Sequence, residues 1–255
     1  MSATVLYEIL HCLAAACLLG WLFFHAFRGP AHTMRYVLAG AAACLFLGDL
    51  YWLAHLVVRG EIPAIFSACD VAYIGFLLMF NAALPCVDPR RLREHPFAIW
   101  MAIFVLLNVA AWMIWTGAWF NDLLWGVPMA VLVIHSAMLV EKSLSPVRRN
   151  VLGVLLALLS VSEAVALAGL AHPLLDLLCV LLWALSLLQL GRALAGTGRP
   201  ACLSVPAWAL LTAFSECASF LTQGAVYYGF QVLTMACFVC AAWSACREGA
   251  ARHAV

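Results

Sequence analysis

Carboxylate and carboxamide side chains recur at similar intervals inside the apolar stretches of this sequence. One series consists of Asp49, Asn108, Glu163 and Glu216, which are separated by 59, 55 and 53 residues. A second series consists of Asp70, Asp122, Asp176 and Gln231, which are separated by 52, 54 and 55 residues. An ionisable group inside a membrane costs several kcal/mol unless it is paired, hydrated or neutralised. These side chains are therefore expected to face the protein interior, and their recurrence predicts four similar helical hairpins.

Six of these acids divide into candidate ligand-binding groups and candidate helix caps. The ligand-binding candidates are Asp49, Asp70, Glu163 and Glu216, which lie inside their predicted helices. Their carboxylates could line a cavity for a cation, a proton, an amine or an outer-leaflet lipid, and the alternative is hydrogen bonding between helices. Asp122 and Asp176 follow Asn121 and Pro173 at predicted helix starts, where a carboxylate accepts from free backbone amides and faces the positive end of the helix dipole.

The composition requires lipid as the solvent for most of these helices. Hydrophobic residues make up 67% of the 255 residues and charged residues only 10%, and a spanning helix needs about 20 apolar residues. We predict an all-α integral membrane protein, with one domain at 1–247 and a tail at 248–255. Nine apolar runs are its predicted spans: 4–27, 36–58, 62–86, 97–117, 120–140, 150–170, 173–194, 203–222 and 226–246. This is one leading helix followed by the four hairpins.

Basic residues predict the orientation of these spans. Twelve of the thirteen lysines and arginines lie in connections on one side, and Arg59 alone lies on the other. Cytoplasmic loops are enriched in basic residues, so the N-terminus is predicted outside and the C-terminus in the cytoplasm. The net charge of +1 lacks the basic footprint of a nucleic-acid-binding protein, and we predict the lipid bilayer as the surrounding partner.

Histidines and cysteines could in principle hold a cofactor. His11 and His55 fall toward the outer side and His25 and His135 toward the inner side, which is the layout that two bis-histidine haems would need. We favour interhelical hydrogen bonds and predict no cofactor, because histidine spacing alone carries little information. The eleven cysteines lack the spacing of a disulfide framework or zinc site, so we predict neither a metal site nor redox chemistry.

Several short motifs resemble a known family of membrane modules. These motifs are GDLYW at 48–52, IP at 62–63, SACDVAYIGF at 67–76, HPLLDLL at 172–178, and the stretch from SEC at 215–217 to GF at 229–230. Together they resemble the multi-span N-terminal input region of many bacterial diguanylate cyclases, phosphodiesterases and some histidine kinases. The resemblance covers most of 36–246 and implies a sensory module in the bacterial cytoplasmic membrane. No output domain of those kinds occurs in this sequence, so it also implies a separate cytoplasmic signalling partner.

Two other functions remain open. A small-molecule or cation transporter would fit the repeated hairpins and their interior acids. An intramembrane lipid hydrolase would fit a similarity of Gly48-Asp49 and the acid of the following helix to lysoplasmalogenase-like enzymes, in which paired carboxylates could activate water. The histidine expected in that following helix is absent, and Asp70 and Tyr73 stand there instead. We therefore favour the sensory module over either alternative.

Overall fold

The computed structural model describes residues 3–28, 33–64, 67–86, 119–141, 181, 185, 204–220 and 224–251. Every regular element within these ranges is a helix, and none is a strand. The elements are α1 (Ala3–Arg28), α2 (Thr33–Arg59), α3 (Ala68–Ala83), η1 (Leu84–Cys86), α5 (Trp119–Glu141), α8 (Ser204–Phe220) and α9 (Gly224–Ala251). The predicted all-α class is confirmed for this part of the chain. The predicted runs 97–117, 150–170 and 173–194 lie outside the described residues, apart from Leu181 and Leu185.

Four of the described helices are long and apolar enough to cross a membrane. These candidate spans are Thr4–Phe27, Thr33–Arg59, Ala68–Cys86 and Gly224–Arg247. A shorter apolar stretch, Leu124–Val140, lies in α5. A helix of this composition satisfies its backbone hydrogen bonds internally, which is the condition for crossing hydrocarbon. The chain is therefore an integral membrane protein.

The connection from α2 to α3 is set by local backbone chemistry. Gly60 has a φ of 70°, which a residue without a Cβ adopts freely, and its N–H donates to the Leu56 carbonyl at 3.0 Å. The chain after it is not helical at 61–64, and α3 begins only at Ala68. The helix thus starts later than the predicted run from 62. Pro63 and the helix-starting Ser67 account for the difference, because both favour extended backbone before a helix.

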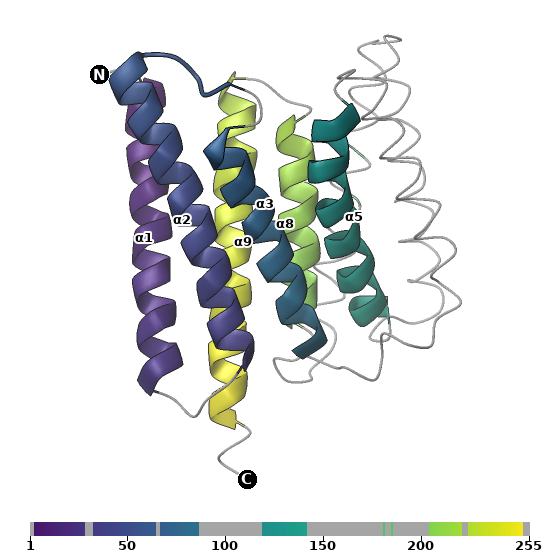
Figure 1. Cartoon of the computed structure of the whole chain (residues 1–255). Helices are drawn as coiled ribbons and strands as arrows, with labels where there is room; N and C mark the ends of the chain where they lie inside the picture. The colour runs from purple at the N-terminus through teal and green to yellow at the C-terminus, as the bar shows by residue number, and fades with distance from the viewer. Residues whose placement is uncertain are drawn as a thin grey trace.

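The helices pack side by side, and the start of α1 and the end of α9 lie at opposite ends of the bundle (Figure 1). α2 packs most extensively against α1 and α3, and α8 packs against α9 as a hairpin. α5 contacts both α3 and α8, whereas α9 contacts both α1 and α2. The chain therefore brings its first two helices against its last one.

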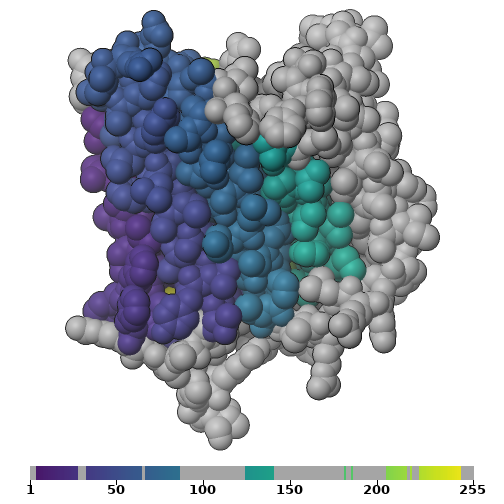
Figure 2. Space-filling model, in the orientation of Figure 1, coloured from purple at the N-terminus to yellow at the C-terminus, as the bar shows by residue number. Residues whose placement is uncertain are grey.

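The outward side of α1, α2 and α3 is apolar. These three helices form one continuous face in Figure 2. Large exposed side chains occur on each helix, including Leu13 (56% exposed), Leu47 (56%) and Leu78 (53%). Such exposure is unfavourable in water but normal where the neighbour is lipid, and it agrees with membrane insertion.

Three phenylalanines form the centre of the packed interior. The ring of Phe238 meets those of Phe76 and Phe80 edge-on, with centroids 4.9 and 5.1 Å apart. All three side chains are buried. Because Phe76 lies one helical turn beyond Tyr73, this apolar layer separates the polar side chains near the start of α3 from the other end of the bundle.

Candidate functional site

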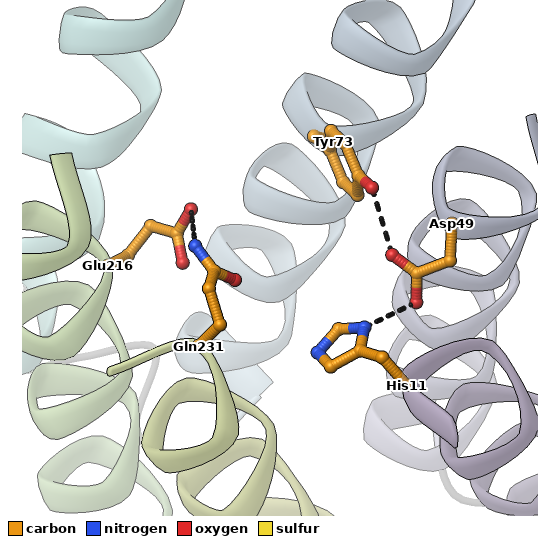
Figure 3. A network of polar contacts seen from close by, with 5 residues as sticks. All are labelled: His11, Asp49, Tyr73, Glu216 and Gln231. Carbon is orange, nitrogen blue, oxygen red and sulfur yellow. Dashed lines mark hydrogen bonds and ion pairs between the residues drawn. The ribbon is translucent and has the colours of Figure 1, made fainter. Parts of the chain in front are cut away.

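A buried carboxylate on α2 connects three helices. Asp49 is 2% exposed, and its Oδ2 lies 2.9 Å from Nδ1 of His11 on α1. Its Oδ1 accepts a hydrogen bond of 2.9 Å from the Tyr73 hydroxyl on α3. Figure 3 shows the two partners approaching the carboxylate from different sides. Both oxygens of Asp49 are therefore satisfied by side chains, as a carboxylate in an apolar bundle requires.

A second polar pair faces this group from the α8–α9 hairpin. Gln231 Nε2 donates to Ser219 Oγ at 2.9 Å and makes a longer contact of 3.5 Å with Glu216 Oε1. In Figure 3 the His11 ring lies between this pair and Asp49, with its second nitrogen directed to the Glu216 and Gln231 side. Asp49 with its two partners and the Glu216–Gln231 pair form one polar cluster, since Glu216 interacts electrostatically with both His11 and Asp49.

Acidic side chains outnumber basic ones in this cluster. Glu8 on α1 is only 9% exposed and interacts electrostatically with His11 and Asp49. The described cluster thus holds three carboxylates, those of Glu8, Asp49 and Glu216, around a single histidine. Burying uncompensated charge is costly, so the cluster favours protons or a bound cation.

Tyrosines border the cluster where α1 and α9 begin. The ring centroids of Tyr7 and Tyr228 lie 4.5 Å apart, and those of Tyr227 and Tyr228 lie 5.3 Å apart. Tyr7 also stacks on His11 at 5.6 Å, and the Tyr228 hydroxyl makes a 3.4 Å contact with Thr4. Aromatic faces carry partial negative charge and therefore add to the attraction for a cation.

Gly48 makes room for the tyrosine that holds Asp49. A Cβ atom at position 48 would lie 2.7 to 3.0 Å from three atoms of the Tyr73 ring. Carbon atoms do not approach so closely, so any larger residue would displace the ring. The GDLYW motif therefore supplies both the carboxylate and the space for its partner.

The predicted ligand-binding acids fall in different surroundings. Asp49 and Glu216 lie in the cluster. Asp70 lies in the first turn of α3, where its Oδ2 accepts a 2.8 Å hydrogen bond from the Ser67 N–H. This is the capping arrangement that the sequence predicted for Asp122 and Asp176, and it occurs here because α3 starts at Ala68. Glu163 lies outside the described residues.

The two predicted caps stay predictions. Asp122 is the fourth residue of α5, near the helix start where we expected it, but its side chain is not among those described. Asp176 lies outside the described residues altogether. A capping role for these two acids therefore has only the sequence pattern behind it.

The histidines proposed as haem ligands have other neighbours. His11 is paired with Asp49 through Nδ1. His55 Nδ1 lies 3.0 Å from the Glu61 carbonyl oxygen in the α2–α3 connection. His25 packs against Trp21, and Nδ1 of His135 has no hydrogen-bond partner among the described residues. Among the described residues, no group of three or more histidine, cysteine, aspartate or glutamate side chains could hold a metal ion.

Sequence reasoning did not pair Asp49 with either of its partners. For Tyr73 a signal exists, because Asp49 and Tyr73 stand equally far from residue 61 in the connection and therefore lie at the same depth of a hairpin. Glu216 and Gln231 are placed less evenly, since Glu216 lies six residues before residue 222 and Gln231 nine residues after it. For His11 the same signal exists, because His11 and Asp49 stand equally far from residue 30, between the end of α1 and the start of α2.

A different polar contact lies at the other end of α1, α2 and α9. Arg35 of α2 is 4% exposed, and its Nη2 donates to the Cys246 carbonyl of α9 at 2.9 Å. Its Nη1 makes a longer contact of 3.5 Å with the His25 carbonyl of α1. His11 and His25 are separated along α1 by about 21 Å, at 1.5 Å per residue. The same three helices are thus joined at both ends.

Comparison of the chain with models of protein families, with characterised proteins and with solved structures finds no match.

Proposed function

We propose that this chain is a membrane sensory module that binds a cation in the polar cluster of Glu8, His11, Asp49 and Glu216 and reports its occupancy to a cytoplasmic partner. The observation that carries the proposal is the excess of carboxylates in a buried cluster that joins α1, α2 and α8. A cation bound there would interact with several helices at once. Binding that favours one helix arrangement over another is the requirement for a switch.

The contacts at both ends of α1, α2 and α9 support a route to the cytoplasm. A cation that draws α1 toward α8 acts on the helix whose far end contacts Arg35. Arg35 also holds α9, whose last residues extend toward the C-terminus. We infer that the partner binds near the Arg35 end of the bundle.

The proposal includes the orientation in the membrane. Nine spans with the N-terminus outside place the polar cluster toward the outer face and twelve of thirteen basic residues toward the cytoplasm. Alkaline phosphatase and fluorescent-protein fusions at Gly60, at 142–149 and at the C-terminus test this arrangement. Phosphatase activity is expected only for the Gly60 fusion, and activity at the C-terminus would contradict it.

Thermal unfolding in detergent tests the binding function. Unfolding is followed with a panel of inorganic and organic cations for the wild type, Asp49→Asn and Glu216→Gln. A bound cation raises the unfolding temperature by mass action, so at least one cation is expected to stabilise the wild type and neither variant. Glu61→Gln is the matched control, because Glu61 is an exposed acid in the α2–α3 connection. Equal behaviour of all four proteins with every cation would contradict the proposal.

Lipid hydrolysis is a second candidate, which the His11–Asp49 pair favours. The sequence lacks a histidine on α3, but α1 supplies one, and its Nδ1 contact leaves Nε2 free to take a proton from water. Purified protein incubated with lysophospholipids and alkenyl lysolipids tests this candidate. Release of fatty acid or aldehyde that His11→Gln abolishes would support it, and no release by the wild type would exclude these substrates.

A further inference from the structure

A buried hydrogen bond between two titratable side chains connects α1 to α2. Nδ1 of His11 lies 2.9 Å from Oδ2 of Asp49, and the two side chains are 11% and 2% exposed. The other oxygen of Asp49 accepts from the Tyr73 hydroxyl, which favours the ionised carboxylate. An ionised carboxylate only accepts hydrogen bonds, so Nδ1 of His11 carries the hydrogen of this contact.

The second ring nitrogen of His11 is the atom that can gain or lose a proton. Because Nδ1 donates to Asp49, Nε2 has a lone pair in the neutral ring and a second N–H in the imidazolium. In Figure 3 this nitrogen points away from Asp49, toward Glu216 and Gln231 of the α8–α9 hairpin. A proton on Nε2 therefore places a positive charge between the carboxylates of two helices, α2 and α8.

The titratable groups around His11 come from each of the neighbouring helices. Within the described residues they are Tyr7, Glu8 and Cys12 of α1, Asp49 of α2, Tyr73 of α3, Glu216 of α8, and Tyr227 and Tyr228 of α9. Each of these groups is neutral or negatively charged. His11 is thus the group through which this set of side chains acquires a positive charge.

A proton on His11 changes the strength of the contact between α1 and α2. With a neutral ring, the buried Asp49 carboxylate has two neutral donors and its charge is not balanced. With an imidazolium, the contact becomes a hydrogen bond between opposite charges, which is about twice as strong. Apolar helix faces gain little from meeting one another in lipid, so such bonds contribute to helix association.

We propose that His11 and Asp49 form a pH-sensitive latch, which holds α1 against α2 while His11 is an imidazolium and weakens when Nε2 loses its proton. The latch goes beyond the proposed cation binding, because a proton on a ring nitrogen needs no cavity for a ligand. With the N-terminus outside, as the basic residues predict, the latch responds to the pH of the outer compartment.

NMR of the histidine rings tests the protonation step. The full chain in lipid nanodiscs carries nitrogen-15 in its histidines, and the ring shifts are followed between about pH 5 and 9, around the ordinary titration of imidazole. The His11 signals, identified by their absence in His11→Gln, are expected to keep a hydrogen on Nδ1 and to lose one from Nε2 as the pH rises. In Asp49→Asn the midpoint should move at least about one pH unit lower. An unchanged midpoint would overturn the proposal.

Hydrogen exchange tests the movement of α1. Exchange of the α1 backbone amides is measured in the same nanodiscs on both sides of the His11 midpoint and corrected for the intrinsic effect of pH. In the wild type, α1 should exchange about five- to tenfold faster above the midpoint than below it. Equal corrected rates on the two sides would overturn the latch.

Variants assign this response to His11. The glutamine of His11→Gln can donate to Asp49 but does not titrate, so this variant should show equal rates on both sides, and Asp49→Asn should do the same. His55→Gln is the matched control and should behave as the wild type, because His55 contacts a backbone carbonyl. A pH response retained by His11→Gln would contradict the proposal. The buffers contain no added metal or organic cations, so the latch and the cation-binding function are tested separately.

Discussion

Buried polar groups at the two ends of α1, α2 and α9 have different kinds of partner. Near the start of α1, side chains meet other side chains, and three carboxylates surround one histidine. Near the end of α1, one buried cation, Arg35, meets backbone carbonyls of two other helices. The Phe76, Phe80 and Phe238 layer lies between these ends.

This difference separates a site that takes part in binding from a contact that holds helices together. The carboxylates near the start of α1 exceed their positive partners, so an added proton or cation improves the local balance. A helix carbonyl such as Cys246 has an intrahelical partner already, and Arg35 adds a second donor to it. At the Arg35 end the buried charge is thus met by backbone carbonyls and not by a carboxylate.

The largest effect is expected from removing the Asp49 carboxylate. Asp49→Ala leaves the Tyr73 hydroxyl and the His11 ring without their acceptor, which should lower the free energy of unfolding by about 3 kcal/mol. Asp49→Asn keeps an oxygen for Tyr73 and should cost less than about 1 kcal/mol. Unfolding in mixed detergent measures both values. Equal losses for the two variants would show that charge, and not hydrogen bonding, holds α1, α2 and α3 together.

A smaller effect is expected from Arg35→Ala. The variant loses the 2.9 Å hydrogen bond to α9 and the packing of the side chain. It also relieves the burial of a charge whose Nε has no partner in the described part of the chain. The net loss should be about 2 kcal/mol, measured by the same unfolding. Arg247→Ala, an exposed cation on α9, should change stability by less than about 0.5 kcal/mol. A larger loss for Arg35→Ala than for Asp49→Ala would reverse the comparison between the two ends.

The smallest effect is expected from adding one methyl group beside the cluster. Gly48→Ala pushes on the Tyr73 ring and should cost about 1.5 kcal/mol. Gly20→Ala is the matched control, because nothing lies within 4 Å of its added Cβ, and alanine there should be neutral or stabilising. In the Gly48→Ala/Tyr73→Leu double variant the two losses should not add, because the ring that clashes is gone. Additive losses would show that the clash is absorbed elsewhere.

The sequence predicted the helices better than their contacts. Long apolar runs determine spans in lipid, so the predicted runs 4–27, 36–58 and 226–246 agree with α1, α2 and α9 to within a few residues except at the end of α9. α9 continues to Ala251 because nothing in its last residues interrupts a helix. The nine-span count and the orientation remain predictions.

The candidate site was predicted in part, for a physical reason. Asp49 and Glu216 stood out because an acid inside an apolar run must face the interior. Their partners did not stand out, since helices that are apolar all round give little indication of which face meets which neighbour. Asp70 was placed among the ligand-binding candidates because the run from 62 obscured the true start of α3 at Ala68.

The hydrogen bond from Arg35 to Cys246 also bears on biosynthesis. The two residues lie 211 positions apart, so the ribosome adds more than two hundred residues after Arg35 before this acceptor exists. Until α9 is inserted, Arg35 lies near the start of α2, within three residues of Thr33, without its Cys246 partner, and its long side chain can reach the water interface there. Insertion of α9 therefore completes this contact, and a chain truncated before α9 should be recognised by quality-control proteases as unfinished.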